Sequence, residues 1–149
     1  MKTIEAPKEH RREEDYILDA QIGFVLRQAH QRHATIFASR MIEDLTPTQW
    51  AALAKLKEIG PSSQNLLGRL TAMDAATIKG VIDRLTKRGF TRTKSDPADG
   101  RRLLVALTER GAALYDRARP LAARITEQTL GPLNERERAA LSALLARLM

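Results

Sequence analysis

Apolar residues recur at the spacing of an amphipathic helix over most of the chain, which predicts a mainly helical protein. The first such segment runs from about residue 15 to residue 40. Its apolar face would consist of Leu18, Ile22, Val25, Ala29, His33, Ile36 and Phe37. Three shorter helices are expected between residues 46 and 88, with inward faces formed by Trp50, Leu53, Leu56, Leu66, Leu67, Leu70, Ile78, Val81, Ile82 and Leu85.

Capping residues mark where these three helices begin and end. The run TPTQ at residues 46–49 has the spacing of a capping box with proline in the first helical position. Ser62 or Ser63 is placed to cap the next helix, and Asp74 the one after it. Gly89 follows two cations and is expected to end that third helix in a left-handed conformation.

A β-hairpin is predicted after the third helix. Residues 91–95 alternate as a strand does, and residues 96–100 (DPADG) have the composition of a turn. Residues 103–107 (LLVAL) provide the returning strand, so the hairpin has a polar, charged tip.

Two further helices close the chain. Thr108 is expected to cap a long helix that is kinked or restarted at Pro120, and Asn134 with Glu137 opens the last one. Their apolar faces would be formed by Leu114, Tyr115, Ala118, Leu121, Ala122, Ile125, Ala140, Leu141, Leu144, Leu145 and Leu148.

The order of elements predicts a winged helix-turn-helix at residues 46–108. Residues 1–14 are expected to be a loose arm, and residues 15–45 and 109–149 to form dimerisation helices. The flanking apolar stripes are hard to bury within one small module, so a homodimer with interlocking termini is the simplest solution.

Composition narrows the class of protein. The 149 residues contain no cysteine, which excludes disulfides, cysteine-ligated metals and thiol catalysis. No apolar run reaches transmembrane length and no signal-peptide core is present, so a cytoplasmic protein without a membrane partner is expected. The net charge is +7, and the segment 55–102 holds eleven Lys and Arg against five Asp and Glu. This concentration favours a nucleic-acid partner over an evenly solvated surface.

The helix at residues 74–88 is the candidate recognition helix, because such helices present their N-terminal residues to the major groove. Methyl groups of Ala and Thr can pack on thymine, Lys can donate to guanine or phosphate, and Gly allows close backbone approach. The alternative is an ordinary solvated helix face. The candidate residues are Ala75, Ala76, Thr77, Lys79 and Gly80.

The hairpin tip supplies the second candidate DNA contact. Asp99 is placed to hold Arg101 by a charge-assisted hydrogen bond and aim it at a narrow minor groove, with Arg102 beside it. The alternative is a surface ion pair of little energetic value. Candidate phosphate contacts are Ser62, Ser63, Gln64, Asn65, Arg84, Lys87, Arg88, Arg92 and Lys94.

Two runs resemble a known family. DPADGRRLLVALTERG at residues 96–111 is similar to the wing signature of MarR (multiple antibiotic resistance regulator) proteins, and IDRLTKRGF at residues 82–90 to the end of their recognition helix. The resemblance covers about residues 15–149. It implies a homodimer that binds double-stranded DNA at a near-palindromic operator and usually represses until a small molecule releases it. It also matches Arg101 to the wing-tip arginine, Asp99 to its partner and Thr77 to a commonly hydroxylated recognition position.

Lys79-Gly80 departs from the family, where a small hydroxyl residue followed by Arg is common. The bases read by this chain therefore cannot be copied from relatives.

The first long helix carries a candidate effector site. Its residues 23–32 resemble those of members that control aromatic-acid degradation, which sense the acid or its coenzyme A thioester. Arg27 and His30 share a helix face, and the guanidinium would bind a carboxylate. The alternative places the aromatic and histidine side chains in the core or at a dimer seam. The candidate ligand residues are Phe24, Arg27, His30, His33, Phe37 and Trp50.

Other functions are less favoured. His30 and His33 could hold a metal, but no third ligand follows, so neither a metal nor another cofactor is expected. No catalytic residue is assigned, because no phosphate-binding loop, nucleophile elbow or dinucleotide turn occurs. The remaining alternatives are a winged-helix protein–protein interaction module, an enzyme that uses His30, and a MarR-type activator.

Overall fold

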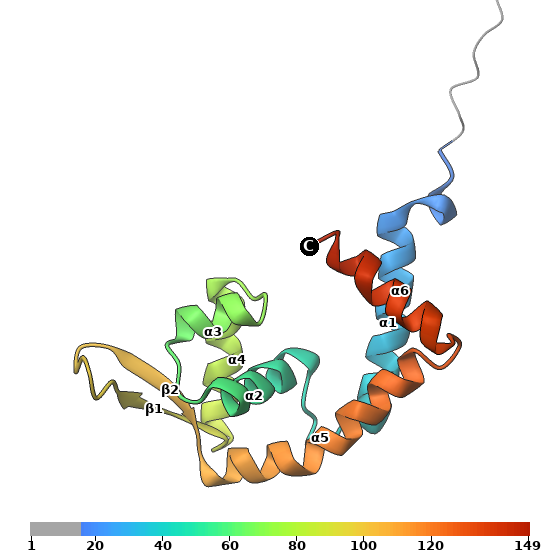
Figure 1. The fold of residues 1–149 in the computed structure, drawn as a ribbon. Coiled ribbons are helices and arrows are strands. Elements are labelled where there is room, and N and C mark those ends of the chain that lie inside the picture. The colour runs from blue at the N-terminus through green and yellow to red at the C-terminus, as the bar shows by residue number, and fades with distance from the viewer. Residues whose placement is uncertain (1–15) are drawn as a thin grey trace, which may run out of the picture.

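The computed structural model describes residues 16–149 (Figure 1). The expected arm at residues 1–14 lies outside these residues. The elements in chain order are η1 (Leu18–Ala20), α1 (Ile22–Arg40), α2 (Pro47–Ile59), α3 (Gln64–Leu70), α4 (Ala75–Lys87), β1 (Thr91–Ser95), β2 (Leu103–Leu107), α5 (Glu109–Thr129) and α6 (Glu135–Ala146). Within residues 16–149, no helix is both long and apolar enough to cross a membrane.

The predicted helix starts are confirmed by their caps. Thr46 and Gln49 form a reciprocal capping box at α2, and Asn134 forms another with the third residue of α6. Ser63, rather than Ser62, caps α3. Thr108 accepts a hydrogen bond from the backbone of Gly111 at the start of α5. Each cap satisfies backbone N–H groups that a helix start leaves unpaired, so local chemistry fixes where each helix begins.

The winged helix-turn-helix encloses the larger hydrophobic core. Leu53, Leu67, Ile78 and Leu85 from α2, α3 and α4 are almost completely buried, as is Leu114 from α5. The inward face predicted for α4 is confirmed, whereas Leu70 and half-buried Trp50 correct the predicted faces of α3 and α2. Leu70 is exposed because α3 ends there and the chain turns toward α4.

The predicted hairpin is confirmed over both strands. β1 and β2 pair antiparallel, from Thr91 opposite Leu107 to Ser95 opposite Leu103. Ser62 extends this sheet, because its backbone exchanges hydrogen bonds of 3.0 and 2.7 Å with the backbone of Val105. The segment before α3 is therefore tied directly to the wing.

A smaller core joins α1 to the second half of α5. Ile36, Phe37 and Ile125 are buried in it, with Trp50 packed against its edge. The Arg32 guanidinium donates to the carbonyls of residues 128 and 129 at the end of α5. A cation at this position satisfies exposed carbonyls and complements the helix dipole.

The first helix corrects the prediction in two ways. α1 begins at Ile22 rather than near residue 15, after the short η1. Ile36 and Phe37 are buried as expected, but Leu18, Ile22 and Val25 are 53%, 66% and 43% exposed. The amphipathic pattern is present, but within one protomer the described residues do not cover it.

Pro120 bends α5 without ending it. The helix is continuous from Glu109 to Thr129, and Figure 1 shows its direction changing about midway. Proline cannot donate the backbone hydrogen bond of a regular helix, and its ring crowds the preceding turn. The bend lets the first half of α5 pack on the winged module and the second half on α1.

Gly111 lies at the tightest approach between α5 and the winged module. A Cβ at this position would be 2.0 Å from the carbonyl oxygen of Phe90, which is far inside van der Waals contact. Phe90 lies three residues beyond the end of α4, so this approach sets how closely α5 lies to α4.

We expect Gly111→Ala to destabilise the protein by about 2–3 kcal/mol, because the added methyl group must push α5 away from Phe90. This loss outweighs the gain of about 1 kcal/mol that alanine brings to a helix. Urea unfolding measures it, with Gly100→Ala as control because nothing lies within 4 Å of a Cβ there. Equal unfolding midpoints for the two variants would contradict the close approach.

Candidate nucleic-acid interface

Two adjoining grooves form a continuous surface on the winged module. The first, of about 510 Å³, lies between α3 and the wing and is lined by Ser63, Gln64, Asn65, Arg69, Arg101, Arg102 and Leu103. The second, of about 310 Å³, lies between α3 and the start of α4 and is lined by Asn65, Gly68, Arg69, Met73, Asp74, Ala75 and Ile78. Because Asn65 and Arg69 line both grooves, the surface runs unbroken from the wing to the recognition helix.

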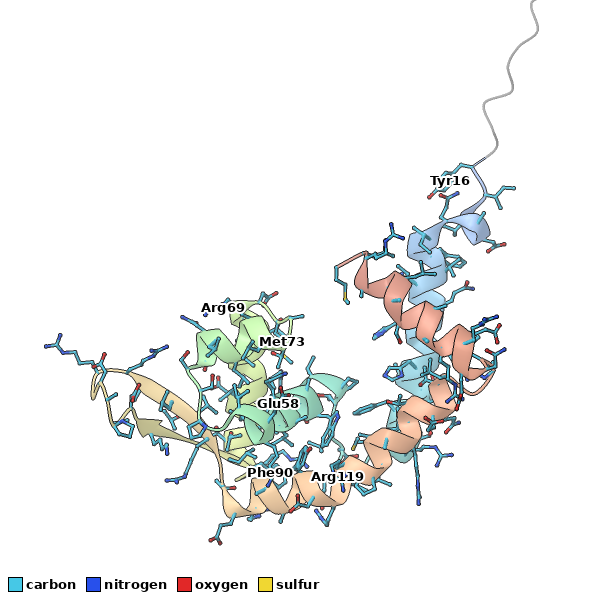
Figure 2. All side chains as sticks on the ribbon, viewed as in Figure 1. Tyr16, Glu58, Arg69, Met73, Phe90 and Arg119 are labelled. Carbon is cyan, nitrogen blue, oxygen red and sulfur yellow. The ribbon has the colours of Figure 1, made fainter. Side chains whose placement is uncertain are left out.

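Arg69 is a candidate contact that the sequence analysis missed. It is exposed on the last turn of α3, and Figure 2 shows it at the outer surface of that helix. The available signal was its spacing of four residues from Asn65, which places both side chains on one helix face. Its guanidinium adds a third arginine to the groove that holds Arg101 and Arg102.

Asp74 fixes the start of α4 at the edge of this surface. Its carboxylate accepts a 2.7 Å hydrogen bond from the backbone N–H of Thr77. Hydrogen bonds from Thr77 lower the pKa of Asp74 below its ordinary value of 3.8. The associated stability is present above that ordinary value and is lost as the pH falls through the lowered one, so the cap is intact at neutral pH.

The next residues of α4 expose a small, mixed surface. Ala75, Ala76 and Thr77 are all exposed. The Lys79 ammonium lies 2.7 Å from the Asp83 carboxylate, and both side chains are about two-thirds exposed, at 66% and 61%. Surface pairs of this kind contribute little free energy, so Lys79 can exchange its partner at small cost.

Gly80 makes room for Arg84 rather than standing open. A Cβ at Gly80 would be 3.3 Å from Nη1 of Arg84, so the guanidinium lies back over the helix at this point. Arg84 therefore covers part of the backbone surface that the sequence analysis expected Gly80 to expose.

The wing turn is held by its two aspartates. The Asp96 carboxylate accepts from the backbone N–H of Ala98, and the Asp99 carboxylate accepts from the backbone N–H of Arg101 at 3.1 Å. Asp99 thus contacts the backbone of Arg101 and not, as expected, its guanidinium. Short Asp side chains bond their own backbone in this way in turns, and the contact fixes where the arginine leaves the hairpin.

The two serines that were expected to donate to phosphate differ in their exposure, because Ser62 is buried and Ser63 lines the groove. Ser62 is buried, with 3% exposure, and its hydroxyl donates to the carbonyl of Ser63. The expectation that Ser62 donates to phosphate is therefore corrected, since its side chain is enclosed by the strand pairing. Ser63 lines the groove, and Arg102 donates to its hydroxyl at 3.4 Å, linking the wing to the start of α3.

Lys87 and Arg88 lie at the end of α4, and the last two candidate contacts lie on the first wing strand. Arg92 is exposed and Lys94 is half-buried. Their spacing of two residues puts both side chains on one face of β1.

The candidate ligand residues fall into two groups along α1. Phe24, Arg27 and His30 lie on its first half, where Arg27 and His30 are exposed. Phe37 lies on the second half, and the helical rise of 1.5 Å per residue separates it from Phe24 by about 20 Å. Within the single chain, one ring-sized molecule cannot contact Phe24 and Phe37 together.

The second group consists of His33, Phe37 and Trp50, which contact other residues of the chain. Nδ1 of His33 lies 2.8 Å from the Thr129 hydroxyl, and its ring lies 6.4 Å from that of Phe37. Trp50 stacks on Tyr115, with centroids 5.4 Å apart and planes 9° from parallel. Between residues 16 and 149, no three His, Cys, Asp or Glu side chains are arranged to hold a metal ion.

Comparison with known proteins places this arrangement in a family. The MarR family profile matches residues 45–103, from the start of α2 to the second wing strand. The transcriptional repressor NicR of Pseudomonas putida is 42% identical over 135 residues, which cover 90% of this chain and 85% of NicR.

Two solved structures share the whole fold. A probable transcriptional regulator from Pseudomonas aeruginosa is 56% identical with a TM-score of 0.87, and the match covers 89% of this chain and 100% of that one. BpsR of Bordetella bronchiseptica, whose DNA binding is regulated by 6-hydroxynicotinic acid, is 40% identical with a TM-score of 0.85, over 89% and 96% of the two chains.

These proteins regulate transcription and are not enzymes, which agrees with the lack of a catalytic motif in the sequence. The similarity extends over both the winged module and the flanking helices. The chain belongs to the MarR family of transcriptional regulators.

Proposed function

We propose that the chain is a repressor that binds a near-palindromic DNA operator as a homodimer and is released by a small aromatic acid. The observation that carries the proposal is the unbroken surface formed by the wing, α3 and the start of α4. It combines three arginines with exposed small residues at the N-terminus of a recognition helix. Arginines bind phosphates and narrow minor grooves, whereas small methyl-bearing side chains contact base edges.

The exposed apolar residues support the dimer. Tyr16, Ile22 and Leu26 at the start of the described chain are 77%, 66% and 42% exposed, and Leu144 and Leu148 on α6 are 58% and 70% exposed. In the view of Figure 1, α1 and α6 both lie on the side of the molecule away from the wing. A second copy related by two-fold symmetry would cover such a surface and set the spacing of the two recognition helices.

The relatives favour an aromatic acid as effector. BpsR responds to 6-hydroxynicotinic acid, a free acid, and this favours the acid over its coenzyme A thioester. Arg27 and His30 on the first half of α1 are exposed and three residues apart, so they can receive a carboxylate together. The effector would act by binding a dimer geometry whose recognition helices no longer match successive turns of the operator.

The central test is footprinting and fluorescence anisotropy with DNA that flanks the chain's own gene, with and without 6-hydroxynicotinate. We expect a protected near-palindrome that 6-hydroxynicotinate releases. Protection that no aromatic acid reverses would remove the effector from the proposal. Absence of protection even at low salt would favour a protein–protein interaction module, since DNA binding is strongest there. A reporter fused to the promoter distinguishes repression from activation.

We expect Arg101→Ala to weaken binding to all operator sequences by about tenfold, because the guanidinium at the wing tip would contact the minor groove without distinguishing individual bases. Anisotropy titrations at physiological salt measure the change. Arg124→Ala removes the same charge from the exposed surface of α5 and serves as the control. If the two variants lose affinity equally, the wing does not contact DNA.

We expect Lys79→Ala to change the preference among operator variants instead, by about fivefold at the base pairs it contacts. Its ammonium projects from the exposed face of α4, where it is held only by Asp83. Competition binding with single-base operator variants measures the preference. A uniform loss across all variants would assign Lys79 to the phosphates.

We expect Arg27→Gln to raise the concentration of 6-hydroxynicotinate needed for release by about tenfold or more, because a charge-assisted hydrogen bond to the carboxylate is lost. Operator affinity without the acid should stay at the wild-type value. Arg124→Gln is the matched control for charge, and its release curve should overlay that of the wild type. Unchanged release in Arg27→Gln would exclude this arginine from the effector site.

A further inference from the structure

The loop between α1 and α2 is the most strained segment of the described chain. Glu43 and Asp44 are consecutive non-glycine residues in the left-handed region, with φ of 57° and 50°. A residue with a side chain is unfavourable in this conformation and persists there only where surrounding contacts hold it. Two in succession indicate that contacts of this loop impose its shape.

Glu43 supplies those contacts to two other elements. Its carboxylate lies 3.9 Å from the Arg88 guanidinium and 3.2 Å from that of Arg117. Arg88 also donates a hydrogen bond to the backbone carbonyl of Glu43. Arg88 is the C-cap of α4, and Arg117 lies on α5 before the bend at Pro120. One residue therefore joins the end of the recognition helix to the helix that spans both cores.

Arg88 also packs on a buried aromatic ring, which connects the Glu43 contact to the end of α4. Its guanidinium lies 5.0 Å from the centre of the Phe90 ring, on which Arg110 also packs at 5.2 Å. Phe90 is buried beside α5, as Figure 2 shows. A displacement of the loop at Glu43 would act on Arg88 through the backbone carbonyl and the carboxylate of Glu43, and through Arg88 on the last turn of α4.

The other side of the loop has room to move. A pocket of about 280 Å³ lies between the end of α1 and the loop, lined by Ala34, Phe37, Ala38, Met41, Asp44, Leu45, Thr46 and Pro47. Close-packed interiors resist small displacements, whereas a segment beside an unfilled pocket can shift without compressing its neighbours. α1 leads directly from Arg27 and His30 into this loop.

We propose that Glu43 is a positioning residue that holds the recognition helix against α5 and transmits a movement of α1 to it. The inference rests on the proposed function, because the movement is the one that an effector on α1 would cause. Coupling of this kind requires an element with two arrangements that both sites influence, and the strained loop is that element.

The test compares Glu43→Gln with the matched control Glu58→Gln. Both variants remove one carboxylate charge, and within residues 16–149 the ion-pair partner of Glu58 is Lys55, at 2.9 Å on the same helix. Glu58 is labelled on α2 in Figure 2. Operator affinity is measured by anisotropy with and without saturating 6-hydroxynicotinate, and the ratio of the two is the release factor. Arg88→Gln and the double variant complete a double-mutant cycle, in which any direct DNA contact of Arg88 cancels from the ratio.

We expect Glu43→Gln to lower the release factor by about threefold to tenfold and Glu58→Gln to leave it unchanged. Arg88→Gln should also lower it, and the double variant should lower it by less than the two single effects combined, because both changes break the Glu43–Arg88 pair. A release factor equal to that of the wild type, or fully additive effects, would overturn the inference. A merely structural role would weaken operator binding with and without the acid alike.

A second measurement separates this inference from the proposed effector. If 6-hydroxynicotinate does not release the wild type, the effector assignment fails while the positioning of α4 can still be measured. We then expect the amides of residues 84–90 to exchange hydrogen faster in Glu43→Gln than in the wild type or Glu58→Gln, because the last turn of α4 loses its support. Equal exchange in all three would overturn the positioning role.

Discussion

The architecture depends on the packing of one bent helix, α5, against both hydrophobic cores. Leu114 and Ala118 belong to the core of the winged module, and Ile125 belongs to the core shared with α1. The contact is tight at Gly111, where no side chain fits against Phe90. Because α5 touches the chain just beyond α4, this helix sets the distance between the candidate DNA-binding surface and α1. α1 is connected to the winged module through α5, through Trp50 on α2 and through the loop at Glu43.

Local chemistry made most of the fold predictable. Caps at Thr46, Asp74, Thr108 and Asn134 depend on side chains within a few residues of the backbone they bind, so the sequence alone identifies them. The hairpin is equally local. The exposure of α1 and α6 was not predictable in the same way, since helical periodicity shows that a face is apolar and does not show what covers it.

In the candidate site too, features that depend on nearby residues were predictable and features that depend on long-range contacts were not. Predicted contacts from the wing and from the starts of α3 and α4 do line the two grooves, because turn and helix geometry fixes these segments locally; they are Ser63, Gln64, Asn65, Ala75, Arg101 and Arg102. Ser62 was expected to donate to phosphate, but its backbone pairs with the wing strand and its side chain is buried. Asp99 was expected to hold the guanidinium of Arg101, but its carboxylate accepts from the backbone of that residue. Both outcomes depend on backbone pairing that the sequence pattern does not show. The candidate ligand residues were chosen by their side-chain chemistry, and the length of α1 places Phe24 and Phe37 too far apart to contact one small molecule.

In the proposed function, charge accounts for attraction to DNA in general and geometry accounts for the choice of operator. The excess of cations in the winged module attracts any DNA, and that attraction is independent of sequence. A shift of helices leaves the charges of the protein unchanged and so does not remove this attraction. An effector that releases the operator must therefore weaken the sequence-specific contacts. That part depends on two recognition helices meeting successive turns of one duplex face, which is sensitive to small rotations. A surface pair such as Lys79–Asp83 suits base reading because it opens at little cost, whereas the tight approach of Gly111 to Phe90 suits the control of rotation because it cannot yield without moving α5.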